Sequence, residues 1–522
     1  MTKRLTRNPH VRPESFFEMD TSATNSKLSS ALPKTDEITA TRPGPRERQR
    51  ITEAPSGSID SQIRSREGKP KAKRWDHIIS QEARIRKGHS LMKAAKFLRN
   101  PGIISLGTGL PSSEYFPFER LSIKVPVTGY FSESQTREFG VTITAGKYDL
   151  AHNKSLFDIS TSFNYGQGSG SAQLLRWVTE HTDLVHHPPY QDWRCAMSVG
   201  STSALEMAFR MLSQPGDMVL FEEYTFSAAV EIATPLGIRP VSIPIDSEGL
   251  LPEAVDDILS DWDVYTYGTR KPHLLYTIPT GQNPTGATQS TARRRSLYSV
   301  CQKHDILVIE DDPYYFLQME PFYAHSGSAT PASSSHAEFL QSLVPSLLSM
   351  DTDGRVMRLD SFSKVISPGS RIGWVTASQQ IIERFKAHAG LSTQGPSGIS
   401  QLLLWKLLEE HWGHPGYLDW LVYLRMEYNS RREIILSACE RFLPQQVVSW
   451  SPPMAETVEE QIFMRVIDHG VLIMCGSWFR ADSTQQLDTL FFRATYAAAP
   501  AEHLVEGIRR LGEAIREEFE LK

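Results

Sequence analysis

The sequence has few of the features that mark secreted, membrane-spanning or nucleic-acid-binding proteins. Its 522 residues include only four cysteines, widely spaced and without a Cys-x-x-Cys pair, so free thiols in a reducing compartment are expected and no metal site. It contains no run of about 18 apolar residues, and no apolar signal-peptide segment follows the basic N-terminus. The net charge of −5 is small. We therefore expect no membrane or nucleic-acid partner and a cytoplasmic location, with mitochondrial import as the weaker alternative.

The composition is that of a folded protein with a polar extension. Hydrophobic residues make up 40% and charged residues 22%, and the length suffices for two domains. Residues 1–75 are basic and poor in aliphatic side chains, which predicts a disordered extension. Apolar residues at helical spacing then predict a helix over 78–98. We divide the remainder into an N-terminal arm with an insertion (76–185), a large domain (186–395) and a small C-terminal domain (396–522).

Strand-like and helix-like segments alternate through the large domain. Short apolar runs at 196–199, 218–221, 274–278, 306–309 and 356–359 are separated by amphipathic stretches, a pattern typical of an α/β fold with a mostly parallel sheet wrapped by helices. Residues 326–336 are rich in Ser and Ala and predict a surface loop. A helical pattern from 402 to 439 and a strand-helix section at 471–511 predict a smaller α+β domain.

Lys364 is the strongest candidate for a catalytic side chain. It closes a Ser-Phe-Ser-Lys segment (361–364) directly after the strand predicted at 356–359, where a parallel sheet presents its ligand-binding loops. A lysine there can form a Schiff base with an aldehyde, and Arg371 nearby can lower its pKa while binding a phosphate. Alone, such a lysine is usually an ordinary surface residue; its neighbours in the sequence argue otherwise.

Two further loops follow predicted strands and carry polar side chains. Asp311 comes after the strand at 306–309, where a carboxylate can pair with a protonated pyridine nitrogen. Asn283 follows the strand at 274–278, and with Tyr314 it can donate to a phenolic oxygen on the same ring. The plainer alternatives are a helix N-cap, which suits Asp312 better than Asp311, and a simple turn at 279–286.

A glycine turn followed by hydroxyl residues predicts a phosphate site at the start of a helix. Ser201 and Thr202 follow the strand at 196–199, so backbone N–H groups and the helix dipole would face an anion. Ser361 and Ser363 can complete the cup together with the arginine at 371. Phe226, after the next strand, can stack on a pyridine face, with ordinary core packing as an almost equal alternative.

Arg493 is the candidate for binding a substrate carboxylate. It lies in an aromatic strand-like run, Phe-Phe-Arg-Ala-Thr-Tyr at 491–496, and its planar guanidinium can hold a carboxylate through two hydrogen bonds. An internal salt bridge is the alternative, because a charge inside an apolar strand is costly unless it is paired.

Together these motifs resemble a fold-type I aminotransferase of the class I and II superfamily, and more narrowly the fungal aromatic amino-acid aminotransferases related to aminoadipate and kynurenine aminotransferases. The resemblance runs from about residue 76 to the end. It implies pyridoxal 5′-phosphate as the cofactor, amino-acid and 2-oxo-acid substrates such as 2-oxoglutarate, and a ping-pong reaction. It also implies a homodimer in which Tyr165 reaches the partner's phosphate and Gly109 closes over the substrate. The motifs that carry it are Gly109-Leu110-Pro111, Tyr165-Gly166, Gly200-Ser201, Asn283-Pro284-Thr285-Gly286, Asp311-Asp312-Pro313-Tyr314, Ser363-Lys364, Arg371 and Phe492-Arg493.

The sequence departs from the resembled pattern after Pro453. A small-domain strand is expected there, whereas residues 454–456 run almost directly into a helix predicted at 458–469. The change leaves a degenerate, non-catalytic paralogue as an alternative. A lyase or decarboxylase on the same scaffold is another, because the fold does not decide which bond to the α-carbon breaks. A transcription regulator is the least favoured, since residues 1–75 lack the paired helices of a DNA-binding module.

Overall fold

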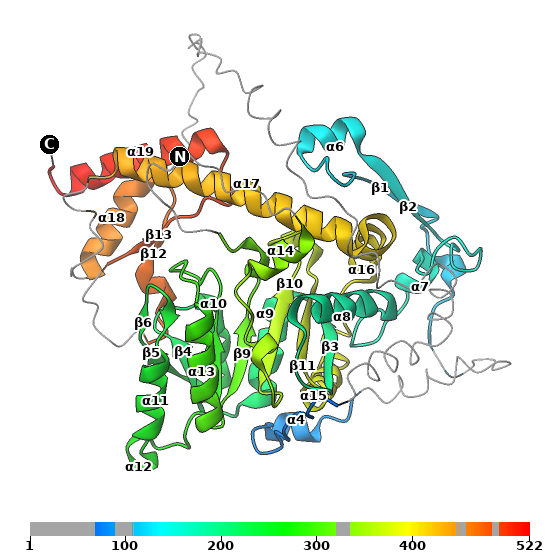
Figure 1. The fold of residues 1–522 in the computed structure, drawn as a ribbon, viewed down its shortest axis with the longest axis horizontal. Coiled ribbons are helices and arrows are strands. Elements are labelled where there is room, and N and C mark those ends of the chain that lie inside the picture. Colours follow the sequence, from blue (N-terminus) through cyan, green and yellow to red (C-terminus); the bar gives the residue numbers. More distant parts are fainter. Residues whose placement is uncertain are drawn as a thin grey trace, which may run out of the picture.

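A seven-stranded sheet forms the centre of the large domain (Figure 1). The computed structural model describes residues 68–88, 107, 109–319, 335–444, 448, 456–482 and 490–521. Strand β11 is antiparallel to both its neighbours, while the pairs from β10 to β5 are parallel, so the prediction of a mostly parallel α/β sheet is confirmed. In spatial order the strands are β3 (Trp193–Ser198), β11 (Gly373–Ser378), β10 (Val356–Ser361), β9 (Leu307–Asp311), β8 (Leu274–Thr277), β4 (Met218–Glu222) and β5 (Arg239–Ile243).

Helices cover both faces of this sheet, which is why its central strands are apolar on both sides. Along β9, Leu307 and Ile309 pack toward one face and Val308 toward the other. The first face is covered by α4 (Gln81–Ile85), α9 (Gly200–Leu212), α10 (Ser227–Ala233) and α15 (Gln379–Ala389). The second face packs against α8 (Ala172–His186), α11 (Pro252–Ser260), α13 (Thr291–Lys303) and α16 (Gly398–Trp405).

The five strands expected in the large sheet are all present, but two other strands of that sheet were missed. Strand β5 carries an arginine and a proline at its start, and β11 carries Thr376, so neither reads as an apolar run. The helix predicted over 78–98 is wrong in extent, because α4 ends at Ile85 and Arg86 is extended; residues 89–98 lie outside the described part. Residues 326–334 of the predicted loop also lie outside it, and His336 begins the short helix α14 (His336–Gln341).

The N-terminal arm carries a small inserted subdomain. Strands β1 (Arg120–Val125) and β2 (Val141–Gly146) form an antiparallel hairpin around α6 (Glu133–Phe139). A capping box between Ser132 and Gln135 starts α6. The insertion is anchored to the body of the protein where the ring nitrogens of His411 and Trp412 contact the carbonyl of Pro126.

A long helix links the two domains. The predicted helical stretch is confirmed as α16, the π-helical turn η8 (Lys406–Trp412) and α17 (Gly413–Phe442), which runs from the large domain to the small one in Figure 1. The small domain packs α17 against α18 (Glu456–Asp468) and α19 (Ala501–Glu518). Its sheet in the described residues pairs β12 (Met474–Cys475) with β13 (Phe492–Arg493). Residues 449–455, where the shortened segment falls, are outside the described part.

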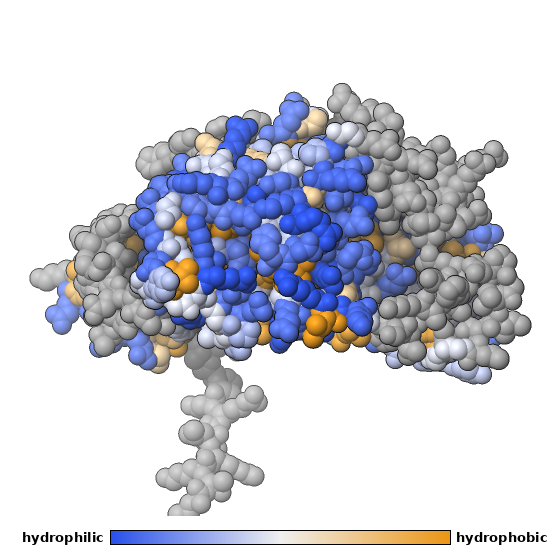
Figure 2. All heavy atoms as spheres, turned by 90° about the horizontal axis from the view of Figure 1, so that it is seen from below, coloured by the Kyte–Doolittle hydropathy of each residue, from blue (hydrophilic) through white to orange (hydrophobic). Residues whose placement is uncertain are grey.

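Short elements complete the chain between these units. They are η3 (Ser113–Tyr115), α7 (Ile159–Ser162), η4 (Thr234–Leu236), β6 (Ile245–Asp246), β7 (Gly249–Leu250), α12 (Val264–Tyr267), η5 (Tyr315–Leu317), η6 (Leu348–Met350), η7 (Pro368–Ser370) and η9 (Gly476–Phe479). Figure 2 shows that hydrophilic residues predominate on the described part of the face seen from below. No helix among the described residues combines the length and apolar character that crossing a bilayer requires.

Candidate active site

The predicted site residues gather where several parallel strands end. Strands β3, β10, β9 and β8 run in the same direction, so the segments after them emerge at one edge of the sheet. Four predicted segments start there. They are the beginning of α9 at Gly200, the loop 279–286, the end of β9 at Asp311 and the segment 361–364.

Asp311 is buried at the end of β9 with one carboxylate oxygen bonded and the other free. The hydroxyl of Tyr276 donates to Oδ2 at 2.8 Å, whereas Oδ1 is buried and has no hydrogen-bond partner among the described residues. Burial raises the pKa of Asp311 to about 7, a rise that the Tyr276 hydrogen bond opposes and the Asp312 carboxylate reinforces. An unbonded buried carboxylate oxygen is costly, which indicates that a donor is missing at this point.

Tyr314 lies close to both the loop after β8 and the predicted catalytic lysine. A Cβ built on Gly281 of that loop would lie 3.5 Å from the Tyr314 Cβ. The Lys364 Nζ lies 5.8 Å from the centre of the Tyr314 ring. Burial raises the pKa of the Tyr314 hydroxyl, and the nearby Asp311 charge adds to that rise. The phenol therefore stays protonated and can donate, while the lysine amine is exposed.

Arg493 reaches across from the small domain to Asn283. Its Nη1 donates to the Asn283 Oδ1 at 2.8 Å, and its guanidinium lies 4.8 Å from the centre of the Phe479 ring. Among the described residues its buried Nε has no acceptor, and the alternative of an internal salt bridge finds no support there. Because Asn283 accepts through its oxygen, its amide nitrogen remains able to donate elsewhere.

The start of α9 lies against the Arg371 side chain, an arrangement suited to an anion. Gly200 has φ +71°, and a Cβ added there would lie 2.7 Å from the Arg371 Nη2, so the guanidinium lies directly against the glycine. The Ser201 hydroxyl is buried and has no partner among the described residues. The Ser361 hydroxyl donates to the Ser363 hydroxyl at 2.8 Å. Free backbone N–H groups at this helix start are suited to a phosphate.

Other predicted residues lie in more open positions. Thr202 is exposed on α9, and Phe226 is partly buried against the core on the α9 side of the sheet, so stacking and core packing both remain possible for it. Tyr165 is 66% exposed. A Cβ added to Gly109 would have no described atom within 4 Å. The described residues thus leave both of them largely uncovered. Their roles and those of the residues above stay predictions.

Several buried polar residues around the site were missed by sequence reasoning. The Glu222 carboxylate accepts from the Thr277 hydroxyl at 2.7 Å and from the Gln282 side chain at 2.9 Å. Gln282 also donates to the Tyr224 carbonyl at 2.6 Å, which fixes the loop that carries Asn283. Burial raises the pKa of Glu222 to about 7. A glutamate that ends an apolar strand was the signal that could have identified this hub.

A second buried network lies on the opposite side of β9. The Arg358 guanidinium is fully buried between the carboxylates of Glu310, Asp312 and Asp360, at 3.2, 3.0 and 3.0 Å respectively. The alternative that Asp312 is a helix N-cap is wrong, because its carboxylate accepts from Arg358 and from the Thr280 hydroxyl instead. An arginine within the apolar run 356–359 could have indicated this ion cluster.

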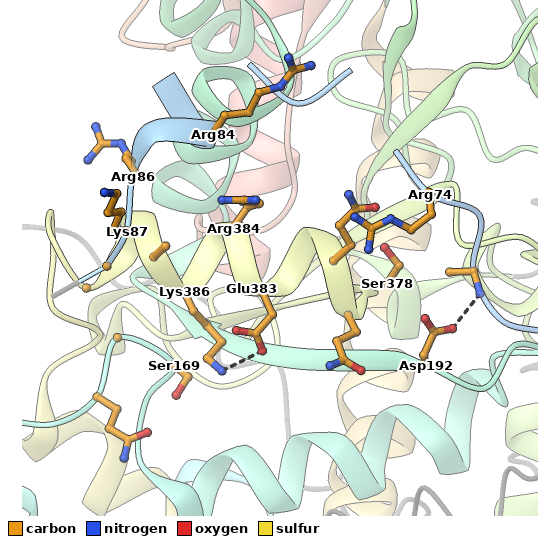
Figure 3. A pocket seen from close by; sticks show the side chains of 18 of the residues that line it. Arg74, Arg84, Arg86, Lys87, Ser169, Asp192, Ser378, Glu383, Arg384 and Lys386 are labelled. Carbon is orange, nitrogen blue, oxygen red and sulfur yellow. Dashed lines mark hydrogen bonds and ion pairs between the residues drawn. The ribbon is translucent and has the colours of Figure 1, made fainter. Parts of the chain in front are cut away.

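A large cleft among the described residues lies elsewhere. It has a volume of about 1110 Å³ and is lined by seven basic side chains from residues 73–87 and α15, including Arg84, Lys87 and Arg384 (Figure 3). No predicted site residue lines it. A second cleft of about 620 Å³ includes Tyr165 but none of the residues at the sheet edge. The candidate site is therefore defined by its chemistry rather than by the size of a cavity.

Comparison with known proteins identifies the class of enzyme. Residues 134–511 match the family "Aminotransferase class I and II". An aromatic amino acid aminotransferase of Schizosaccharomyces pombe is 40% identical over 467 residues, 85% of this chain and 98% of that protein. A bovine mitochondrial kynurenine/alpha-aminoadipate aminotransferase is 31% identical over 440 residues, covering 80% of this chain and 92% of the other. The crystal structure of aminotransferase Aro8 from Candida albicans has a TM-score of 0.79 and 39% identity, covering 87% of this chain and all of that one.

These matches define a fold-type I, pyridoxal-phosphate-dependent enzyme that transfers amino groups. The chain belongs to the class I and II aminotransferase family, as its motifs led us to expect. The resemblance to aromatic and kynurenine/aminoadipate aminotransferases is confirmed at the level of the family.

The residues present fit pyridoxal 5′-phosphate, the cofactor of this family. The unbonded Oδ1 of Asp311 suits a protonated pyridine nitrogen. The unbonded Ser201 hydroxyl and the space that Gly200 leaves beside Arg371 suit a phosphate. Two buried polar atoms thus lack partners among the described residues at this edge of the sheet, and the cofactor carries a matching group for each.

Proposed function

We propose that this aminotransferase moves the amino group of an aromatic or related L-amino acid to a 2-oxo acid such as 2-oxoglutarate. The candidate donors are phenylalanine, tyrosine, tryptophan, kynurenine and 2-aminoadipate. The names of the similar proteins support this substrate class. The observation that carries the proposal is the Arg493 guanidinium, which contacts Asn283 and the Phe479 ring and whose Nε has no acceptor among the described residues. It offers a carboxylate a cation beside aromatic side chains.

The reaction assigns a task to each of the chain's side chains. When bound, the cofactor supplies an aldehyde that reacts with amines and a ring that accepts electrons. The Lys364 Nζ would hold the cofactor covalently until the substrate amine displaces it, and the freed amine would then take the proton from the substrate α-carbon. Asp311 holds the ring nitrogen protonated through its free Oδ1, and the protonated Tyr314 donates to the ring oxygen together with the Asn283 amide. The phosphate is held by Ser201, Thr202, Ser361, Ser363 and Arg371, and Phe226 covers a ring face.

The active enzyme in this proposal is a homodimer. Lys364, Arg371 and Tyr165 are all exposed in the single chain, although a reaction of this kind requires a site that excludes water. A second copy that covers the sheet edge would bury these groups, and its Tyr165 would complete the phosphate cup. Gly109 and its neighbours would then close over the bound amino acid.

A substrate panel with product balance tests the proposal. Purified protein is loaded with pyridoxal 5′-phosphate and given each candidate amino acid with 2-oxoglutarate. The oxo acid formed, glutamate, ammonia and carbon dioxide are then measured. We expect one molecule of oxo acid and one of glutamate for each amino acid consumed. Ammonia or carbon dioxide without matching glutamate would instead establish the lyase or decarboxylase alternative, and a protein that binds no cofactor would establish the degenerate one. Sedimentation of the same sample reports whether it is a dimer.

A further inference from the structure

Tyr276 lies next to Asp311 and was not among the residues indicated by the sequence motifs. It belongs to β8, the strand neighbouring β9, and is paired with Ile309, two residues before the aspartate. Side chains two apart share a face of a sheet, so Tyr276 and Asp311 both point toward the α9 side. Its hydroxyl donates to the Asp311 Oδ2 at 2.8 Å.

The tyrosine is rigidly held, and its hydroxyl donates to Asp311. Its side chain is fully buried, and its ring packs against two phenylalanine rings. The centre of the Tyr276 ring lies 5.6 Å from that of Phe221 and 6.3 Å from that of Phe209. Burial and the Asp311 charge raise the pKa of the hydroxyl well above its usual value, so the phenol keeps its proton. The ring therefore presents one fixed O–H to one oxygen of the carboxylate.

The hydrogen bond leaves the two oxygens of Asp311 with different tasks. Oδ2 is occupied by Tyr276, while Oδ1 has no partner among the described residues. A carboxylate fixed at one oxygen cannot rotate freely, so its other oxygen keeps one direction. A hydrogen bond to the charged form also stabilises that form, which opposes the effect of burial on this group.

We propose that Tyr276 is a positioning residue, which orients the Asp311 carboxylate through Oδ2 so that Oδ1 faces the ring nitrogen of the cofactor and stays ionised. This inference rests on the proposed function, because it concerns the same site. Tyr276 itself touches neither cofactor nor substrate in this arrangement. It acts only through the aspartate.

The charged surroundings of Asp311 make the tyrosine's contribution necessary. The carboxylates of Asp312, Asp360 and Glu222 interact unfavourably with its charge, and burial removes water. The Arg358 cation opposes them, but it lies among three carboxylates of its own. Tyr276 is a neutral donor that contacts Asp311 directly, and the aspartate also raises the pKa of the Tyr314 phenol.

Replacing Tyr276 by phenylalanine tests the proposal with little change in shape. Tyr298→Phe is the matched control, because the Tyr298 hydroxyl also donates to a buried aspartate, Asp351 at 3.1 Å, in a different part of the domain. Each protein is loaded with pyridoxal 5′-phosphate labelled with ¹⁵N in the ring, and the nitrogen signal is followed against pH. Thermal unfolding establishes that each variant is folded.

For Tyr276→Phe we expect the ring nitrogen to lose its proton at lower pH than in the wild type. We also expect kcat to fall about tenfold or more, the scale of a hydrogen bond to a charged group, with little change in the KM for the amino acid. Tyr298→Phe should match the wild type in both. Identical nitrogen titrations in the wild type and Tyr276→Phe, or the same shift in both variants, would overturn the proposal.

A double-mutant cycle on cofactor affinity provides a test that does not depend on turnover. Tyr276→Phe should weaken the binding of pyridoxal 5′-phosphate in the wild-type background and have no further effect in Asp311→Ala, because it acts through that side chain. Equal effects in both backgrounds would contradict the inference. A wild-type protein that binds no cofactor would refute the proposed function itself, and that outcome is distinct from a cofactor-binding enzyme that is indifferent to Tyr276.

Discussion

The Arg493 guanidinium donates to the Asn283 side-chain oxygen at 2.8 Å, and this contact joins the small domain to a loop of the large one. Arg493 lies on β13, opposite Met474 of β12, so a two-stranded sheet fixes its backbone. Asn283 is fixed in turn by the loop that Gln282 anchors to Glu222. The proposed carboxylate site is thus assembled from segments 210 residues apart.

Arg493→Lys should lower kcat/KM for an aromatic amino acid by roughly 10- to 100-fold, because an ammonium cannot form the paired hydrogen bonds of a guanidinium. The measurement compares each amino acid with the corresponding amine that lacks the carboxylate. With the amine as substrate, Arg493→Lys and the wild type should have the same kcat/KM. Arg465→Lys, at an exposed ion pair on α18, is the matched control and should leave both rates unchanged. An equal loss for amino acid and amine would argue against a carboxylate contact.

Lys364→Ala should remove the covalent attachment of the cofactor while leaving the phosphate site intact. The protein is treated with borohydride after loading, and its mass is measured. Wild type and the control Lys386→Ala, which changes a lysine of the basic cleft, should both gain the mass of one reduced cofactor. Lys364→Ala should gain none, although equilibrium dialysis should still detect bound cofactor. A retained adduct in Lys364→Ala would place the attachment on another lysine.

The buried carboxyl of Glu222 should make the cofactor-free protein less stable as pH rises. Burial raises its pKa from 4.5 to about 7 in the folded state, so the folded protein binds this proton more tightly than the unfolded chain. The tighter binding of this proton adds roughly 3 kcal/mol to the free energy of unfolding. This stabilisation is complete below pH 4.5 and is lost as the pH rises through about 7.

Glu222→Gln should therefore flatten the fall in unfolding free energy between pH 5 and 8, measured by urea titration. Part of the fall should remain, because burial also raises the pKa of Asp311 and Asp351 to about 7. The exposed Glu383→Gln is the control and should keep the wild-type slope. An unchanged slope in Glu222→Gln would show that this carboxyl is ionised in the folded protein throughout that range.

Arg358→Met should destabilise the protein by about 3 to 5 kcal/mol, because three buried carboxylates would lose the cation between them. Urea unfolding near neutral pH measures the loss. The loss should shrink at acidic pH, where Asp360, whose pKa burial raises to about 6, accepts a proton. Arg465→Met, which breaks an exposed pair, should change stability little. A small effect at position 358 would mean that the cluster relaxes or takes up water.

The sequence predicted those parts of the fold and site that depend on local pattern. Apolar runs located β3, β4, β8, β9 and β10, and the residues after them were correctly expected at one edge, because parallel strands present their ends together. Strands with polar or proline residues, such as β5, were missed. The end of α4 at Ile85 was also missed, because apolar spacing continues beyond it.

Partnerships between distant residues were not predictable from those patterns. Nothing in the segment 274–278 indicates that the Tyr276 hydroxyl faces Asp311, since an aromatic residue in an apolar strand is usually ordinary core. Likewise, the contact between Arg493 and Asn283 depends on how α17 places the small domain. Motifs identified which side chains carry chemistry, whereas the geometry that directs them comes from the sheet register and domain packing.

Gly200→Ala should weaken cofactor binding by displacing Arg371 from the start of α9. The backbone there has φ +71°, which costs a residue with a side chain about 1 kcal/mol. The added methyl would also lie 2.7 Å from the Arg371 Nη2, so the guanidinium has to move away from the proposed phosphate position.

Gly216→Ala separates these two effects, because Gly216 has φ +91° and no atom within 4 Å of its Cβ position. Both variants should lose similar stability in thermal unfolding, since both place alanine in a left-handed backbone. Only Gly200→Ala should release pyridoxal 5′-phosphate more readily in dialysis, and excess inorganic phosphate should compete less well for its site. Equal cofactor retention in the two variants would mean that the phosphate does not lie between Arg371 and the N-terminus of α9.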